Sequence, residues 1–239
     1  MTKLRSAPIG LLSLIIILTG CTSTGEIDNP LNRRATWFSF ISGEDIATAC
    51  RVDGRERYRL TYIADRNVQV RIYDIDADVT PVAQLRSRIM TVAASDWFPW
   101  EFLSDPSRPF RPFDKVETLP ADKLEAIRQD LLASGWSTQP APVGKKIAST
   151  SYAWLVAGCR NGEFSFQAYE YPDADFQALT FPEILYEVDQ NDIDVRQPPT
   201  DGERRTLTPN QAIGGRSAAD EGGNIYNMRV NANGVSVSH

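Results

Sequence analysis

The stretch "SYAWLVAGCRNGEFSFQAYEYP", residues 151–172, decides the fold of this chain. Asn161-Gly162 at its centre is the strongest short-range signal for a two-residue β-hairpin turn, and it lies between two alternating runs. Such a turn pairs Cys159 with Phe164, Ala157 with Phe166 and Leu155 with Ala168. The sequence therefore predicts an antiparallel hairpin here.

Both faces of this hairpin carry large apolar side chains. The face opposite Cys159 holds Tyr152, Trp154, Val156, Gln167, Tyr169 and Tyr171. Aromatic residues on both faces indicate either a hairpin sandwiched in the middle of the fold or an exposed stacking surface. We favour the sandwiched hairpin, because burial of apolar area is what stabilises such side chains.

A second hairpin is expected from residue 57 onward, where the pattern changes to a period of two. We interpret residues 65–67 as a three-residue loop with Asn67 in the left-handed conformation. Tyr62 then pairs with Val70, and Leu60 pairs with Ile72. A slip of one residue would mix the apolar and polar faces, so the pattern favours this register.

In this register, Arg57, Arg59 and Arg71 share the polar face of the second hairpin. Three guanidinium groups on one face form a candidate surface for a phosphate or carboxylate ligand. A solvated sheet face is the simpler interpretation, and we favour it.

Two helices are expected beside the hairpins. In "LPADKLEAIRQDLLASG", residues 119–135, Leu124, Ile127 and Leu131 recur at helical spacing, which predicts the main helix at about 120–134. A short N-terminal helix at about 43–51 opens after Ser42 and ends before Gly54. The fold class is therefore α+β, with antiparallel β-hairpins packed against one main helix.

The N-terminus carries a short apolar segment that ends at a cysteine. Lys3 and Arg5 precede an apolar run from Ile9 to Leu18, which is shorter than the roughly 20 residues of a membrane-spanning helix. The run closes on Leu18-Thr19-Gly20-Cys21. This segment, residues 1–25 only, resembles the signal peptide and lipobox of bacterial lipoproteins. An ordinary signal peptide with a chance cysteine is the alternative.

The lipoprotein resemblance implies an anchor and a location. Cys21 would become the first mature residue and carry the lipid, including a palmitate-type chain, and several acyl chains hold a protein firmly on a bilayer. In many Gram-negative bacteria an Asp after the lipidated cysteine retains the protein in the inner membrane, whereas this chain has Thr22. We therefore expect a lipid-anchored protein on the periplasmic face of the cell outer membrane.

The negative net charge of the chain limits the classes of partner that it is expected to bind. Removing residues 1–20 takes two positive charges from a chain of net charge −6, which leaves −8. Nucleic acids and anionic lipid surfaces both favour basic patches, so no nucleic-acid partner is expected. Apolar residues make up 42% of the chain, with five Trp and ten Phe, which is enough for a sizeable core.

Two cysteines remain after lipidation, Cys50 and Cys159. An exported domain folds in an oxidising compartment, where a leftover pair is most simply one structural disulfide. Their wide separation argues against a C-x-x-C redox motif, and two thiols without a nearby histidine cannot complete a zinc site.

The only histidine is the last residue, His239. Catalytic triads, histidine bases and imidazole-rich metal sites are therefore improbable. We expect no catalytic residues, no cofactor and no metal. Two clusters of aspartates, 74/76/78 and 189/192/194, are interpreted as solvated loop acids, with adventitious calcium binding as the alternative. The first cluster lacks the Gly and Glu of an EF-hand loop.

Trp97 and Trp100 lie in "SDWFPWEFLSDPSRPFRPFDK", residues 95–115, a segment rich in aromatics and prolines. Aromatic faces stack on sugar rings, so this segment is a candidate glycan-binding surface. Packing of these rings around the core is the interpretation we favour.

The expected organisation is a signal peptide (1–20), a tether (21–35), a single α+β periplasmic domain (36–196) and a polar, mobile tail (197–239). Asn233-Gly234 favours a terminal hairpin within that tail. The expected function is a non-catalytic envelope module for assembly, scaffolding or ligand capture, with an envelope protein or a glycan as partner. The alternatives are a glycan-active hydrolase with paired Asp or Glu and a small-molecule or lipid-binding lobe.

Overall fold

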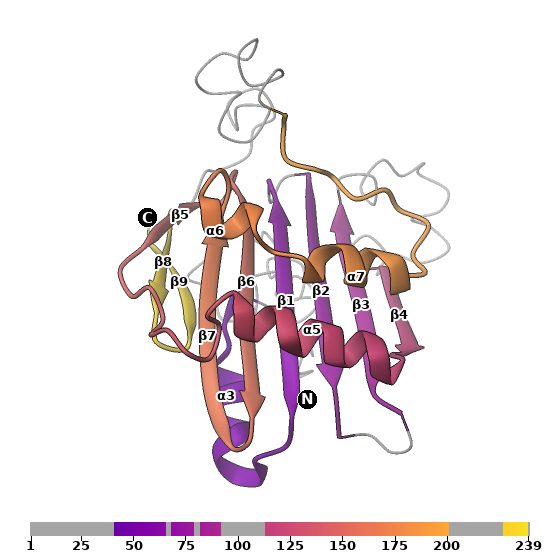
Figure 1. Cartoon of the computed structure of the whole chain (residues 1–239). Coiled ribbons are helices and arrows are strands. Elements are labelled where there is room, and N and C mark those ends of the chain that lie inside the picture. Colours follow the sequence, from indigo (N-terminus) through magenta and orange to yellow (C-terminus); the bar gives the residue numbers. More distant parts are fainter. Residues whose placement is uncertain (1–40, 66–67, 79–81, 92–112, 201–226, 239) are drawn as a thin grey trace, which may run out of the picture.

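The structure is a computed structural model, and it describes residues 41–65, 68–78, 82–91, 113–200 and 227–238. These residues form two antiparallel sheets and four helices (Figure 1), which confirms the α+β class. Cys21, the tether, and Trp97 and Trp100 lie outside the described residues.

The main sheet has the strand order β4-β3-β2-β1-β6-β7. Its strands are β1 (Arg57–Ala64), β2 (Gln69–Asp76), β3 (Gln84–Thr91), β4 (Phe113–Thr118), β6 (Tyr152–Arg160) and β7 (Glu163–Glu170). Every neighbouring pair is antiparallel. The two predicted hairpins, β1–β2 and β6–β7, therefore meet at the centre, where β1 pairs with β6.

A smaller sheet has the order β5-β8-β9. Its strands are β5 (Lys146–Ala148), β8 (Asn227–Asn231) and β9 (Gly234–Ser238). The terminal hairpin is thus present, and it belongs to this second sheet. The helices are α3 (Glu44–Asp53), α5 (Ala121–Ala133), α6 (Ala174–Gln177) and α7 (Phe181–Val188).

The β6–β7 hairpin has the predicted register, with Cys159 opposite Phe164 and Ala157 opposite Phe166. Asn161 and Gly162 both have positive φ, 54° and 76°, as a type I′ turn requires. The whole of β6 except Arg160 is buried. The sandwiched placement is therefore confirmed for β6, whereas β7 is the edge strand of the sheet and is buried only over 166–169.

The predicted register of the β1–β2 hairpin is wrong by one residue. Tyr62 pairs with Arg71, and Leu60 pairs with Tyr73. Asp65 takes the left-handed conformation (φ 51°), and its carbonyl accepts hydrogen bonds from the amides of Val68 and Gln69 at 2.7 and 3.0 Å. Both faces of this sheet are covered, so apolar alternation could not select the register.

The register divides the main sheet into two faces. The helical face carries Tyr58, Leu60, Tyr73 and Trp154 and packs under α5 and α7, which cross the strands in Figure 1. Leu124, Ile127 and Leu131 of α5 are buried there, as the helical spacing predicted. Phe181 and Leu185 of α7 complete this core.

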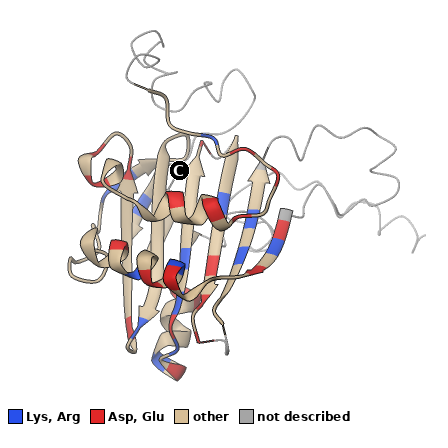
Figure 2. Cartoon of the chain, turned by 45° about the vertical axis from the view of Figure 1, so that its right-hand side comes forward, with Lys and Arg blue, Asp and Glu red and all other residues tan. Residues whose placement is uncertain are grey.

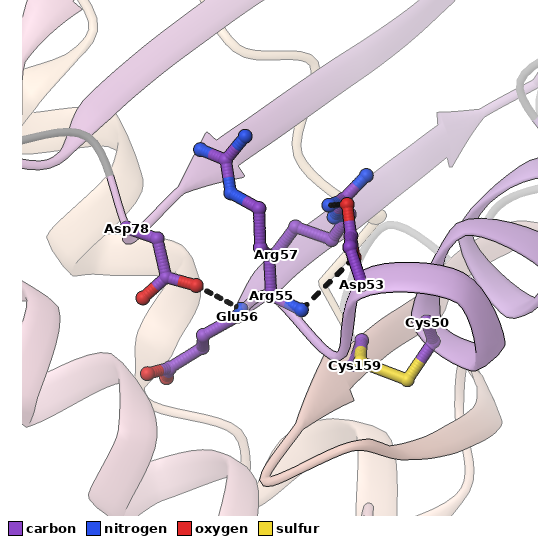
Figure 3. The surroundings of a disulfide bond; sticks show 7 residues. All are labelled: Cys50, Asp53, Arg55, Glu56, Arg57, Asp78 and Cys159. Carbon is purple, nitrogen blue, oxygen red and sulfur yellow. Dashed lines mark hydrogen bonds and ion pairs between the residues drawn. A yellow bond between two sulfur atoms is a disulfide. The ribbon is translucent and has the colours of Figure 1, made fainter.

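The opposite face, which we call the disulfide face, carries Arg57, Arg59, Asp74 and Cys159. Its apolar part packs against α3 and the small sheet, through Ile46, Ile147, Met228 and Val230 among others. The disulfide between Cys50 and Cys159 is present, with the two Cα atoms 5.6 Å apart, and it fastens α3 to the end of β6 (Figure 3). Gly54 ends α3 in the left-handed conformation, as expected.

Arg71 does not share a face with Arg57 and Arg59, because the register places it on the helical face. Its side chain is 1% exposed, and Nη1 lies 2.8 Å from Oδ2 of Asp189, whose side chain is 2% exposed. The hydroxyl of Tyr73 donates to the same oxygen at 2.9 Å. Asp189 was interpreted as a solvated loop acid, which is wrong: it is the buried counter-ion of Arg71.

Residues 189–200 extend along the helical face after α7. The side-chain Nε2 of Gln69 donates to the carbonyl of Asp194 at 2.8 Å, and the hydroxyl of Tyr62 donates to the carbonyl of Arg196 at 2.8 Å. Tyr171 reaches the carbonyl of Pro199 at 2.6 Å. The expected tail from residue 197 therefore begins, over 197–200, as a packed segment.

Candidate functional site

A hollow of about 400 Å³ lies on the disulfide face, over β1, β2, β3 and β4. Figure 2 marks the charged positions along the strands of the sheet in blue and red. The charged residues of its lining are Asp45, Arg57, Arg59, Asp74, Asp76, Arg86 and Arg88. The lining itself holds four arginines and three aspartates, and two further carboxylates, Asp53 and Asp114, pair with its Arg57 and Arg86 from just outside it.

The floor of the hollow is an ion-pair ladder that runs across the strands. Asp74 of β2 accepts from Nε of Arg59 at 2.7 Å and from Nη1 of Arg88 at 2.6 Å. Side chains at neighbouring positions of adjacent strands lie close enough for such pairs. The three side chains are 12%, 13% and 22% exposed for Arg59, Arg88 and Asp74. They form a partly buried, pre-organised floor.

Helix α3 supplies one wall. Both oxygens of Asp45 accept from Arg59, at 3.0 and 2.9 Å, and Asp53 accepts from Nη2 of Arg57 at 2.6 Å. Burial alone would lower the pKa of the Arg59 guanidinium, but Asp74 and Asp45 raise it above its ordinary value. The disulfide holds the C-terminal half of α3, so it also holds this wall (Figure 3).

Two of the arginines keep unused donors. A guanidinium carries five N–H groups. Among the described residues, the side chain of Arg57 hydrogen-bonds only to Asp53, and its Nε is buried without an acceptor. Arg86 uses Nε and Nη2 on Asp114, and no described residue accepts from its Nη1. That hydrogen-bonded pair raises the pKa of Arg86 and lowers the pKa of Asp114.

The structure brings together some of the predicted site residues and separates others. Arg57 and Arg59 line the hollow, and Arg71 lies on the opposite face as part of a structural ion pair. Asp74 and Asp76 were interpreted as solvated loop acids, but they belong to β2 and pair with arginines. Cys50 and Cys159 are bonded to each other.

Sequence reasoning missed Arg86 and Arg88 of β3. The signal was available, because "QLRSRIMT", residues 84–91, alternates polar and apolar residues with a period of two. Burial of Leu85 and Ile89 on the helical face directs both arginines toward the hollow.

The carboxylates of the hollow do not form the pair that a glycosidase needs. Asp45, Asp74 and Asp76 each have oxygens occupied by guanidinium groups.

Outside the hollow, desolvation by burial raises the pKa of two carboxyl groups, Glu117 and Glu170. They lie on β4 and β7, the opposite edges of the sheet, roughly 24 Å apart at about 4.8 Å per strand. A glycosidase pair is separated by about 5 to 10 Å.

No group of three or more His, Cys, Asp or Glu side chains within the described ranges is arranged to hold a metal ion. Of the helices in that part of the chain, none is both long and apolar enough to cross a membrane. No protein-family model, curated protein or solved structure matches this chain.

Proposed function

We propose that this protein is a lipid-anchored, non-catalytic module of the cell envelope, held by Cys21 on the periplasmic face of the outer membrane, that captures an envelope ligand in the arginine-lined hollow. The observation that carries the capture role is the hollow itself: four arginines converge on a cavity of about 400 Å³. The sequence of the first 25 residues supports the anchor.

The hollow suits binding better than chemistry. Its carboxylates are already engaged by arginines, and the only histidine of the chain is its last residue. A lipid-binding lobe calls for a closed apolar cavity, whereas charged side chains line this hollow. The disulfide and the buried Arg71–Asp189 pair stiffen the sheet on both faces, which lowers the entropy cost of binding.

The anchor is tested by labelling cells with a palmitate analogue. The wild-type chain should incorporate the label and fractionate with outer membranes, and Cys21→Ser should do neither. Label in Cys21→Ser, or an unlabelled wild type, would show that the lipobox interpretation is wrong.

The capture role is tested by cosedimentation of the detergent-solubilised full chain with purified peptidoglycan sacculi, which contain no bilayer for the lipid anchor to enter. We expect retention on the sacculi and its loss in Arg59→Gln, since Arg59 links α3 to the floor of the hollow. Arg229→Gln is the matched control, because this exposed residue lies on β8 of the small sheet. Equal retention of both variants would exclude the hollow as the capture site.

A further inference from the structure

The hollow contains two arginines whose unused donors identify the chemistry of its ligand. Arg57 lies on β1 and Arg86 on β3, with β2 between them. Neighbouring strands are about 4.8 Å apart, so the backbones of β1 and β3 are separated by about 10 Å laterally. Two arginine side chains can reach a single ligand across this distance. Both line the same hollow at diagonal positions across β2, where Arg57 lies opposite Asp76 and Arg86 opposite Asp74.

The two arginines differ from Arg59, which is committed to the ladder. Arg59 binds two carboxylates, Asp74 and Asp45. Arg57 binds one, and its buried Nε meets no acceptor among the described residues. The Nε is shielded from solvent, so a ligand in the hollow reaches Arg57 through the accessible part of its side chain, which is 24% exposed.

Arg86 is the more accessible partner, because its side chain is 49% exposed. Its Nη1 group adds a second set of donors at the rim, next to the exposed amide-bearing side chain of Gln84. Asp114, which holds the other side of the guanidinium, is 31% exposed. An incoming anion can therefore add to Arg86 or displace Asp114 without breaking the buried floor.

We infer that the hollow binds a polyanionic ligand through phosphate or carboxylate oxygens, with Arg57 and Arg86 as the contacting residues. Guanidinium groups bind both oxyanions through paired N–H donors. Asp74 and Asp45 engage the floor arginines, whereas Arg57 and Arg86 each pair with one carboxylate and retain N–H groups that no described residue accepts. This inference rests on the proposed capture role and specifies its ligand class.

The experiment is a calorimetric titration of the detergent-solubilised full chain with pyrophosphate in one arm and citrate in the other, at low ionic strength. Saturable binding of pyrophosphate alone identifies a phosphate-bearing ligand, binding of citrate alone a carboxylate-bearing one, and binding of both the shared oxyanion chemistry. Arg86→Gln should weaken the binding at least about tenfold, the loss expected for a charge-assisted hydrogen bond. Arg86→Lys should restore part of it, because the charge remains and the planar fork is lost.

Arg229→Gln removes the same charge outside the hollow and should leave the dissociation constant within about twofold. A second measurement follows the Nε–Hε signal of Arg57 by NMR in the wild type, which should shift on saturation. No saturable binding of either probe, or equal affinities of Arg86→Gln and Arg229→Gln, overturns the inference. Loss of oxyanion binding alongside intact cosedimentation would remove the ligand class and leave the capture role standing.

Discussion

Removal of the Cys50–Cys159 disulfide should destabilise the fold strongly. The bond joins residues 109 positions apart. In the chain-entropy model, a closed loop of this length stabilises the native state by up to about 4.8 kcal/mol. For a protein of this size class, 1 kcal/mol corresponds to roughly 2 to 4 °C in Tm, so Cys50→Ala/Cys159→Ala should lower Tm by about 10 to 20 °C.

The assay is thermal and urea unfolding of the full chain, followed by circular dichroism, with wild type in the presence and absence of reductant. Both sulfurs are buried, with Cys50 3% and Cys159 0% exposed, so reduction should require prior unfolding and be slow under native conditions. The double variant keeps Cys21 and should still be lipidated. A Tm within about 3 °C of wild type, or free thiols at both positions in the unreduced native protein, would refute this reasoning.

Three further changes test the interior. Asp189→Asn leaves the Arg71 cation buried without its counter-ion and should cost about 3 to 5 kcal/mol in urea unfolding; unchanged stability would show that the network is dispensable. Gly158→Ala places a Cβ 2.7 Å from buried Trp136 and should lower the free energy of unfolding by about 1 to 3 kcal/mol in the same measurement. Unchanged stability would mean that Trp136 moves away from β6 at no energetic cost. Burial alone would raise the pKa of Glu56, but hydrogen bonds from Arg128 and Tyr58 lower this pKa below the ordinary 4.5. The stability that the Glu56 carboxylate contributes is therefore present above pH 4.5 and is lost as the pH falls through the lowered pKa. Glu56→Gln should be less stable at pH 7 and lose that part of the acid dependence, and parallel pH profiles of the two proteins would contradict this.

The local elements were predictable where one short stretch of sequence contains the whole determinant. Asn161-Gly162 adopts positive φ at both positions, and the helical spacing of Leu124, Ile127 and Leu131 matches the buried stripe of α5. The export-type N-terminus and the even pair of remaining cysteines predicted the disulfide that the structure contains. The turn and the helix depend on backbone conformation, which residues a few positions apart specify. The disulfide depends on an oxidising compartment, which the export-type N-terminus indicates.

The candidate site was only partly predictable. Arg57 and Arg59 were named as a candidate surface, but Arg71 was grouped with them through a register that is wrong by one residue. Apolar residues occur on both faces of β1 and β2, because α5 and α7 cover one face and α3 and the small sheet cover the other. The register was predicted from apolar and polar alternation, which assumes that one face of the hairpin is solvated. That alternation could not detect that both faces are covered.

By itself, the sequence determined the fold class, the Asn161-Gly162 turn, the positions of α3 and α5, the net acidity and the pairing of the two cysteines. The tertiary structure alone decided the strand order β4-β3-β2-β1-β6-β7, the hollow and the burial of Asp189. Turns and helices follow from contacts between residues a few positions apart. The hollow instead brings together residues as far apart in the sequence as Asp45 and Val116, and Arg71 binds Asp189, 118 positions away. These contacts exist only after the sheet has formed and both of its faces have been covered.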